Sequence, residues 1–342
     1  MPGGNGFAPR GEAEELARFR RLAAATIAAT FVLILIGGAV RVSDSGLGCG
    51  AAGSGTHGWP LCEGGLVPNA DANAIVEFSH RIAATVVAVL ILAMAWLVWR
   101  RLRAHRWLVR GTIAAGVLVL IQAGLGGVTV ENNLHEALVA AHLGLAMVLL
   151  GLLVVLRRMA RPEQAAIPSS RALRILAVTS AALVLCTIVA GGVVAGTEGE
   201  GTANEPVMGA HLACGQQFPT CLDRFMPFGT GRLVDIHLTH RLFMYLAAIS
   251  VLAMGAIALR EGVRARPFFV APGLLVAQIL LGALNVWLGE HPGLIIGHLA
   301  LGMLLWWTVV QATSSLLPAS LSVRERIGPS PATTRTAEAQ VH

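Results

Sequence analysis

Residues 122–147 read QAGLGGVTVENNLHEALVAAHLGLAM, and residues 278–303 read QILLGALNVWLGEHPGLIIGHLALGM. The two stretches align without a gap. The matched residues are Gln122, Gly126, Val130, His135, His142 and Met147 in the first stretch, and Gln278, Gly282, Val286, His291, His298 and Met303 in the second. Each stretch joins two long apolar blocks, so the match indicates an internal duplication of helices.

The duplication extends toward the N-terminal side of both stretches. V-E-F-S-H-R at residues 76–81 matches I-H-L-T-H-R at residues 236–241, and Gly37-Gly38 matches Gly191-Gly192. Each half of the chain therefore holds four related apolar blocks.

The blocks are long enough to cross a lipid bilayer, which takes about 20 apolar residues. The chain is 55% hydrophobic and only 13% charged, about half the charge usual in soluble proteins. Backbone groups in lipid must be satisfied within the segment, so the blocks are expected to be helices. The eight blocks are 22–40, 75–99, 111–130, 137–156, 175–195, 236–259, 268–288 and 294–317.

These blocks predict an all-α integral membrane protein of eight transmembrane helices, arranged as two pseudo-symmetric four-helix bundles. Four spans per half is an even number, so both halves have the same orientation, which defines a parallel repeat about an axis along the membrane normal. The predicted organisation is a tail (1–17), a first bundle (18–160), a linker (161–174), a second bundle (175–318) and a second tail (319–342).

The charge distribution predicts the topology. The net charge is +6, and all 25 basic residues are arginines. Twenty of them fall in the two tails and in the second, fourth and sixth loops, which is the pattern of cytoplasmic segments. We therefore expect a multi-pass protein of the cell (plasma) membrane with both termini in the cytoplasm, no cleaved signal and no nucleic-acid partner.

Four histidines lie inside the spans at related positions. The repeat relates His80 to His240 and His142 to His298, on the second and fourth helices of each half. Ionisable residues within a span are costly and indicate function. Facing helices of a bundle commonly build cofactor sites, and paired neutral imidazoles suit haem iron. The sequence thus predicts one haem site in each half, although a single such histidine would more often serve packing.

Two arginines and a glutamate accompany these histidines. Arg81 and Arg241 directly follow His80 and His240; they are candidate partners for haem propionates, with snorkelling to the outer interface as the equal alternative. Glu77 shares a helix face with His80, and His237 replaces it in the second half. This asymmetry suggests a catalytic role for Glu77 in proton relay or charge stabilisation; the alternative is that Glu77 only pairs with Arg81 or faces the aqueous mouth of its helix.

Four of the five cysteines lie in the outward loops, as the pairs Cys49 with Cys62 and Cys214 with Cys221. Disulfides persist on the oxidising side of a membrane, so we expect two. The alternative is a metal site that includes His57 or His211, but neither spacing matches an established zinc pattern. Cys186, inside the fifth span, is expected to be a small buried residue.

Taken jointly, these motifs resemble the haem A synthases of the CtaA/Cox15 type over essentially all eight spans. The resemblance rests on E-F-S-H-R at residues 77–81, on W-P-L-C at residues 59–62, on the A-H-L and G-H-L helices around His142 and His298, and on the duplicated four-span layout.

The resemblance implies oxidation of the C8 methyl of haem O to a formyl group, which gives haem A for terminal oxidases. His80 and His142 would bind the substrate haem, Glu77 would be important for catalysis, and His240 and His298 would hold a haem b cofactor. The cysteine pairs resemble the family's disulfide, although Cys49 and Cys62 lie farther apart than is usual there.

Two other functions compete with this interpretation. A dihaem b-type electron carrier that reacts with quinol would need the same histidines, but neither Glu77 nor the family motif. A transporter with parallel repeats would place its ion-binding groups near the midplane, whereas the polar residues here gather near the outer face. A haem O synthase and the terminal oxidase assembly machinery are the expected protein partners.

Overall fold

A computed structural model describes residues 10–51, 53–161, 166–197, 209–289 and 291–316. These residues form eight long α-helices, each apolar enough to cross a membrane. Only 22 to 44% of the most apolar window of each helix is buried inside the protein, so the remaining apolar surface needs lipid around it. The helices are α1 (Arg10–Val42), α2 (Ala72–Arg101), α3 (Arg106–Glu131), α4 (Glu136–Met159), α5 (Arg171–Gly196), α6 (Arg232–Arg260), α7 (Pro267–Trp287) and α8 (Pro292–Leu316).

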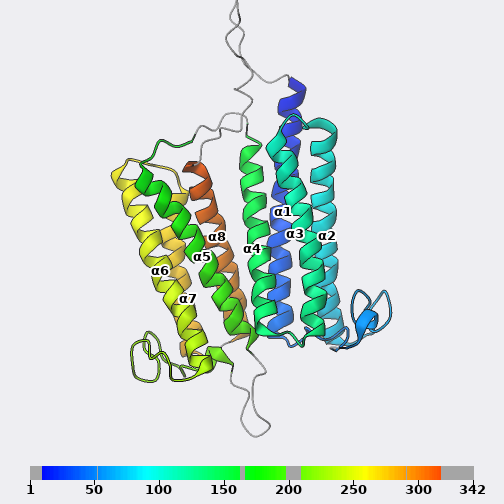
Figure 1. Cartoon of the computed structure of the whole chain (residues 1–342), viewed down its shortest axis with the longest axis vertical. Helices are drawn as coiled ribbons and strands as arrows, with labels where there is room; N and C mark the ends of the chain where they lie inside the picture. The colour runs from blue at the N-terminus through cyan, green and yellow to red at the C-terminus, as the bar shows by residue number, and fades with distance from the viewer. Residues whose placement is uncertain (1–9, 52, 162–165, 198–208, 290, 317–342) are drawn as a thin grey trace, which may run out of the picture.

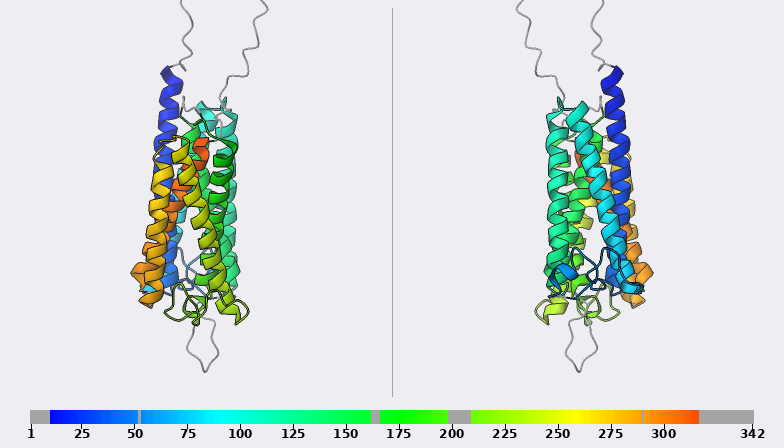
Figure 2. Two further views of the ribbon diagram at one scale, coloured as in Figure 1. Left: turned by 90° about the vertical axis from the view of Figure 1, so that its left-hand side faces the viewer. Right: turned by 90° about the vertical axis from the view of Figure 1, so that its right-hand side faces the viewer.

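The helices stand side by side in two groups, α1–α4 and α5–α8 (Figure 1). The start of α1 and the end of α8 lie at the same end of the bundle, and the two long cysteine loops lie at the other end (Figures 1 and 2). The prediction of an all-α, multi-pass membrane protein is confirmed. The duplication of the halves stays a prediction, but several contacts described below occur once in each half.

The two groups meet where α4 packs against α5 and α8, and where α1 packs against α8. Two glycines allow this close approach: a Cβ atom at Gly38 would lie 2.7 Å from Leu299, and one at Gly192 would lie 3.3 Å from Leu143. Deeper in the interface, the indole nitrogen of Trp306 donates a hydrogen bond to the carbonyl of Met147, at 2.8 Å. Close packing of small residues is a common way to join helices in lipid.

The first helix extends into the predicted tail (1–17). It begins at Arg10; Leu16 is buried, and His105 contacts Glu12 at 2.9 Å, so tertiary contacts extend the helix beyond its apolar block. One expectation about a single residue needs correction. Cys186 is exposed, because it lies on the outer, lipid-facing side of α5. The remaining parts of the predicted tails and linker, 1–9, 162–165 and 317–342, lie outside the described residues.

Candidate functional site

The first histidine pair faces across the first bundle. His80 on α2 and His142 on α4 have ring centroids 6.5 Å apart, and their planes are inclined by 57°. Two metal–nitrogen bonds of about 2 Å, each followed by about 1 Å from nitrogen to ring centre, would together span about 6 Å between the ring centres of two imidazoles that bind one metal. The two imidazoles are therefore close enough that both could hold one metal group between them.

Each of the four predicted ligand histidines packs against a glycine of a neighbouring helix. A Cβ atom at Gly37 would lie 3.0 Å from Cε1 of His80, and a Cβ at Gly191 would lie 3.1 Å from Cε1 of His240. The corresponding distances are 3.6 Å for Gly126 with His142 and 2.9 Å for Gly282 with His298. The same pair of glycines thus seats the imidazoles in both halves. Gly126 and Gly282 were visible in the sequence match, but nothing in the sequence linked them to the histidines.

The Nδ1 atoms of these histidines differ in their surroundings. Nδ1 of His142 and of His298 is buried without a hydrogen-bond partner, whereas the His80 imidazole contacts the backbone of Leu33. Nδ1 of His240 lies 3.0 Å from the carbonyl oxygen of Thr187, which favours the tautomer whose Nε2 is free to bind a metal.

Two glutamines from the sequence match also contact the ligand helices. The Gln122 side chain donates to the carbonyl of His142 at 2.9 Å. Nε2 of Gln278 lies 3.1 Å from Nε2 of His298, so binding of iron to that nitrogen requires the glutamine to give up this contact. Both glutamines are functional candidates that the sequence argument had left without a role.

The residues present fit a haem in each half. Neutral imidazoles are good ligands for haem iron, the glycines leave room for their rings, and the contact of His240 Nδ1 with Thr187 leaves Nε2 of that ring available to a metal. The assignments of His80, His142, His240 and His298 as ligands stay predictions.

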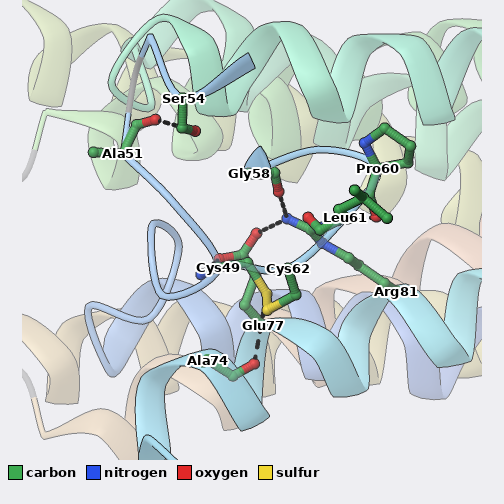
Figure 3. Close-up of polar contacts among 10 residues, drawn as sticks. All are labelled: Cys49, Ala51, Ser54, Gly58, Pro60, Leu61, Cys62, Ala74, Glu77 and Arg81. Atoms are coloured by element: carbon green, nitrogen blue, oxygen red, sulfur yellow. Dashed lines mark hydrogen bonds and ion pairs between the residues drawn. A yellow bond between two sulfur atoms is a disulfide. The ribbon is translucent and has the colours of Figure 1, made fainter. Parts of the chain in front are cut away.

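Glu77 and Arg81 form a polar cluster with the first cysteine loop (Figure 3). Glu77 is 5% exposed; one carboxylate oxygen pairs with Arg81, and the other accepts the backbone N–H of Cys49 at 2.7 Å. The Arg81 guanidinium also donates to the carbonyls of Gly58 and Leu61, each at 2.7 Å. The cluster therefore fastens the loop across the outer end of α2.

Arg241 has the same arrangement in the second half. It is 2% exposed and donates to the carbonyls of Gln217 and Thr220, each at 2.8 Å. His237, at the position of Glu77, places its Nδ1 2.8 Å from the carbonyl oxygen of Ala210. Both arginines thus bind loop carbonyls, a role that neither expectation for them had included. Their contact with haem propionates stays a prediction.

Both predicted cysteine pairs are joined. The sulfur atoms are 2.02 Å apart in Cys49–Cys62 and 2.03 Å apart in Cys214–Cys221. Each disulfide is followed by the same tight turn, in which Cys62 pairs with Gly65 and Cys221 with Arg224.

The two loops attach differently to the rest of the bundle. In the first loop, the Trp59 ring packs on Gly127 of α3, about 3 Å from where a Cβ would lie, and Glu131 accepts the N–H groups of Gly53 and Gly55. In the second loop, Phe218 packs edge-on against Trp287. The Trp59 contact ties the first loop to the helix that carries Gly126.

No cluster of three or more metal-ligating side chains occurs within the described part of the chain, so the structure gives no support to a metal site at His57 or His211. Burial, followed by the charge of Arg41, lowers the pKa of His211 below its usual value. At neutral pH this imidazole is therefore uncharged.

The fold and the site define a helical membrane protein with two pairs of buried histidines beneath disulfide-closed loops. The model of the family described as cytochrome oxidase assembly protein (COX15-CtaA) matches residues 20–310. A protein named haem A synthase from Symbiobacterium thermophilum is 31% identical over 279 residues, which cover 78% of this chain and 84% of the relative.

Two further relatives with the same name match over shorter stretches. The protein from Halalkalibacterium halodurans is 30% identical over 61% of this chain and 66% of its own length. The protein from Bacillus pumilus is 35% identical over 36% of this chain and 39% of its own length. These two alignments thus span less than two thirds of the relatives. The match to the family model covers most of the chain, which belongs to the COX15-CtaA family.

Proposed function

We propose that this protein is a haem A synthase, which oxidises the C8 methyl of haem O to a formyl group. The observation that carries the proposal is the family match over residues 20–310, which places both histidine pairs inside the matched region. The site agrees with it, because a haem-modifying enzyme needs one half to receive a substrate haem and the other to retain a cofactor. The difference between Glu77 and His237 distinguishes the halves at the position next to the ligands.

In the first half, His80 and His142 would bind the substrate haem and fix its orientation between α2 and α4. Oxidation of a methyl group releases protons, and Glu77 is the buried carboxylate closest in sequence to these ligands. Both of its oxygens are engaged, by Arg81 and by Cys49. Proton transfer through Glu77 therefore requires one of these two bonds to be exchanged during turnover.

In the second half, His240 and His298 would hold haem b, which would supply one-electron transfer through its iron when bound. Arg81 and Arg241 bind the outer loops over the two sites. Arg81 would also lie near any haem propionate that reaches the outer end of α2. The loops would limit the access of water to the site from the outer side.

We place the protein in the plasma membrane with both termini in the cytoplasm, supported by the arginine-rich loops and by the common end at which α1 begins and α8 ends (Figure 1). A haem O synthase would supply the substrate, and the assembly machinery of terminal oxidases would receive the product. Lipid contacts the outer helix faces, and nucleic acid has no role.

The test is mass analysis of haems extracted from cells that make haem O, with and without this protein. Haem A, or its hydroxylated intermediate, is expected only when the protein is present. A folded, haem-loaded protein that leaves haem O unconverted would contradict the proposal and favour a dihaem electron carrier, for which quinol oxidation would then be measured.

A further inference from the structure

A groove opens between α1 and α2 on the lipid-facing surface of the first half. Its lining consists of Ala28, Ala29 and Val32 from α1, and of Ala83 and Val86 from α2, and its volume is about 330 Å³. Every lining side chain is small and apolar. In a membrane, a groove of this kind is filled by a hydrocarbon chain.

The groove begins close to the first histidine pair. Ala83 follows His80 by three residues and lies on the same side of α2, about 4.5 Å further along the axis. On α1, the His80 ring lies against Gly37, and Val32 precedes Gly37 by about 7.5 Å along the helix. The groove therefore runs from beside His80 toward the middle of the bilayer.

The second half has larger side chains at three of the five corresponding places, Leu183, Phe243 and Leu246, whereas Ala182 is identical to Ala28 and Cys186 is smaller than Val32. Gly191 seats His240 as Gly37 seats His80, and this contact fixes the register between the two helix pairs. In this register Leu183 corresponds to Ala29, and Phe243 corresponds to Ala83. All four side chains are half-buried, so two small side chains in the first half correspond to two large ones in the second.

Haem O differs from haem B in carrying a long prenyl chain on the porphyrin. A helical bundle that receives haem O must provide an exit for this chain, whereas a bundle that retains haem B need not. We propose that the groove between α1 and α2 holds the prenyl chain of haem O, and that Leu183 and Phe243 close the equivalent exit in the second half. The inference rests on the proposed function.

The selection would be steric, because lipid solvates a prenyl chain as well as an apolar groove does. A large side chain at the base of the groove would collide with the prenyl chain and leave the porphyrin contacts intact. Overpacking of this kind typically weakens binding by roughly tenfold or more.

The experiment compares binding of haem O and haem B to the first site, in full-length protein in nanodiscs whose second site is already loaded. Ala83→Phe is expected to weaken haem O binding by roughly tenfold or more and to change haem B binding by less than about twofold, as read from the absorbance titration. Ala114→Phe is the matched control, because Ala114 is exposed on α3 away from the groove, and it should bind both haems as the wild type does.

Two further variants keep the test decisive if Ala83→Phe does not fold. Ala29→Leu narrows the groove from α1, and it should also weaken haem O binding selectively. Phe243→Ala opens the second half, and its second site should then accept haem O during reconstitution.

Undiminished haem O binding in Ala83→Phe and Ala29→Leu would overturn the inference and assign the groove to a lipid acyl chain. Equal loss of both haems would also count against it, since that result means a disturbed site. The proposed function is tested separately by conversion of haem O in cells with the wild-type protein. If the wild type converts haem O but the variants do not discriminate between haem O and haem B, the proposed function stands and only the inference about the groove is wrong.

Discussion

At the residue scale, the contacts between glycines and histidines give the sharpest prediction. Gly282→Ala places a methyl group 2.9 Å from Cε1 of His298, which displaces the imidazole. We expect loss of the b-type absorbance spectrum from purified protein, although no ligand has been removed. Gly273→Ala on the same helix is the control, because a Cβ there meets nothing within 4 Å and a helical alanine is favoured over glycine. A normal spectrum in Gly282→Ala would show that His298 can move without losing the haem.

The ligands themselves make a second prediction. His240→Ala or His298→Ala should remove the tightly held b-type spectrum, whereas His80→Ala and His142→Ala should retain it and abolish turnover. His291→Ala serves as the control, since His291 precedes α8 and its ring lies at the exposed start of that helix. An unchanged spectrum in either second-half variant would contradict the assignment of that site.

Glu77 allows a third test. Glu77→Gln keeps the size of the side chain and removes its charge, so the protein should still bind haem but lose most of its conversion of haem O to haem A, measured by mass analysis of extracted haems. Loss of the ion pair with Arg81 should also loosen the first loop. Full activity in this variant would show that Glu77 only holds the first loop in place and has no catalytic role.

The sequence predicted the histidines but not what surrounds them. Ionisable residues stand out in an apolar span, and the repeat singled out four of them. Their glycine seats and the contacts of Gln122 and Gln278 depend on how helices distant in sequence pack together, which periodicity does not encode. Cys186 was predicted wrongly for the same reason, since the sequence could not distinguish the core side of α5 from its lipid side.

At the scale of elements, each cysteine loop is fastened to its helix by one arginine. Arg241→Gln would leave the carbonyls of Gln217 and Thr220 without their charged donor, at a cost of about 2 kcal/mol. We expect faster hydrogen exchange in residues 214–224, measured by mass spectrometry. Arg241→Lys should restore little, because an ammonium cannot bridge several carbonyls as a planar guanidinium does.

A control for this experiment is Arg103→Gln, at the opposite end of the bundle, which should leave exchange in residues 214–224 unchanged.

The eight helices were predicted well because long apolar blocks define them. The loops were not, because the hydrogen bonds of Arg81 and Arg241 join residues about 20 positions apart that carry no periodic signal.

At the scale of the whole molecule, the arginine distribution predicts that the loop between α6 and α7 is cytoplasmic. A single cysteine introduced at Arg264, in a variant with Cys186 replaced, should resist a membrane-impermeant thiol reagent in intact cells and react after permeabilisation. A cysteine at exposed Leu66, in the first outward loop, should react in intact cells. The reverse pattern would invert the topology.

Gly38 contacts Leu299, and Gly192 contacts Leu143. In the sequence match Gly38 corresponds to Gly192 and Leu143 corresponds to Leu299, so the two contacts are equivalent. A surface that meets its own copy in this reciprocal manner is what joins the subunits of a two-fold symmetric homodimer. The arrangement suggests an ancestor in which two identical four-helix chains paired before their genes fused. Two separately expressed fragments, 1–161 and 166–342, should accordingly find each other in the membrane and copurify.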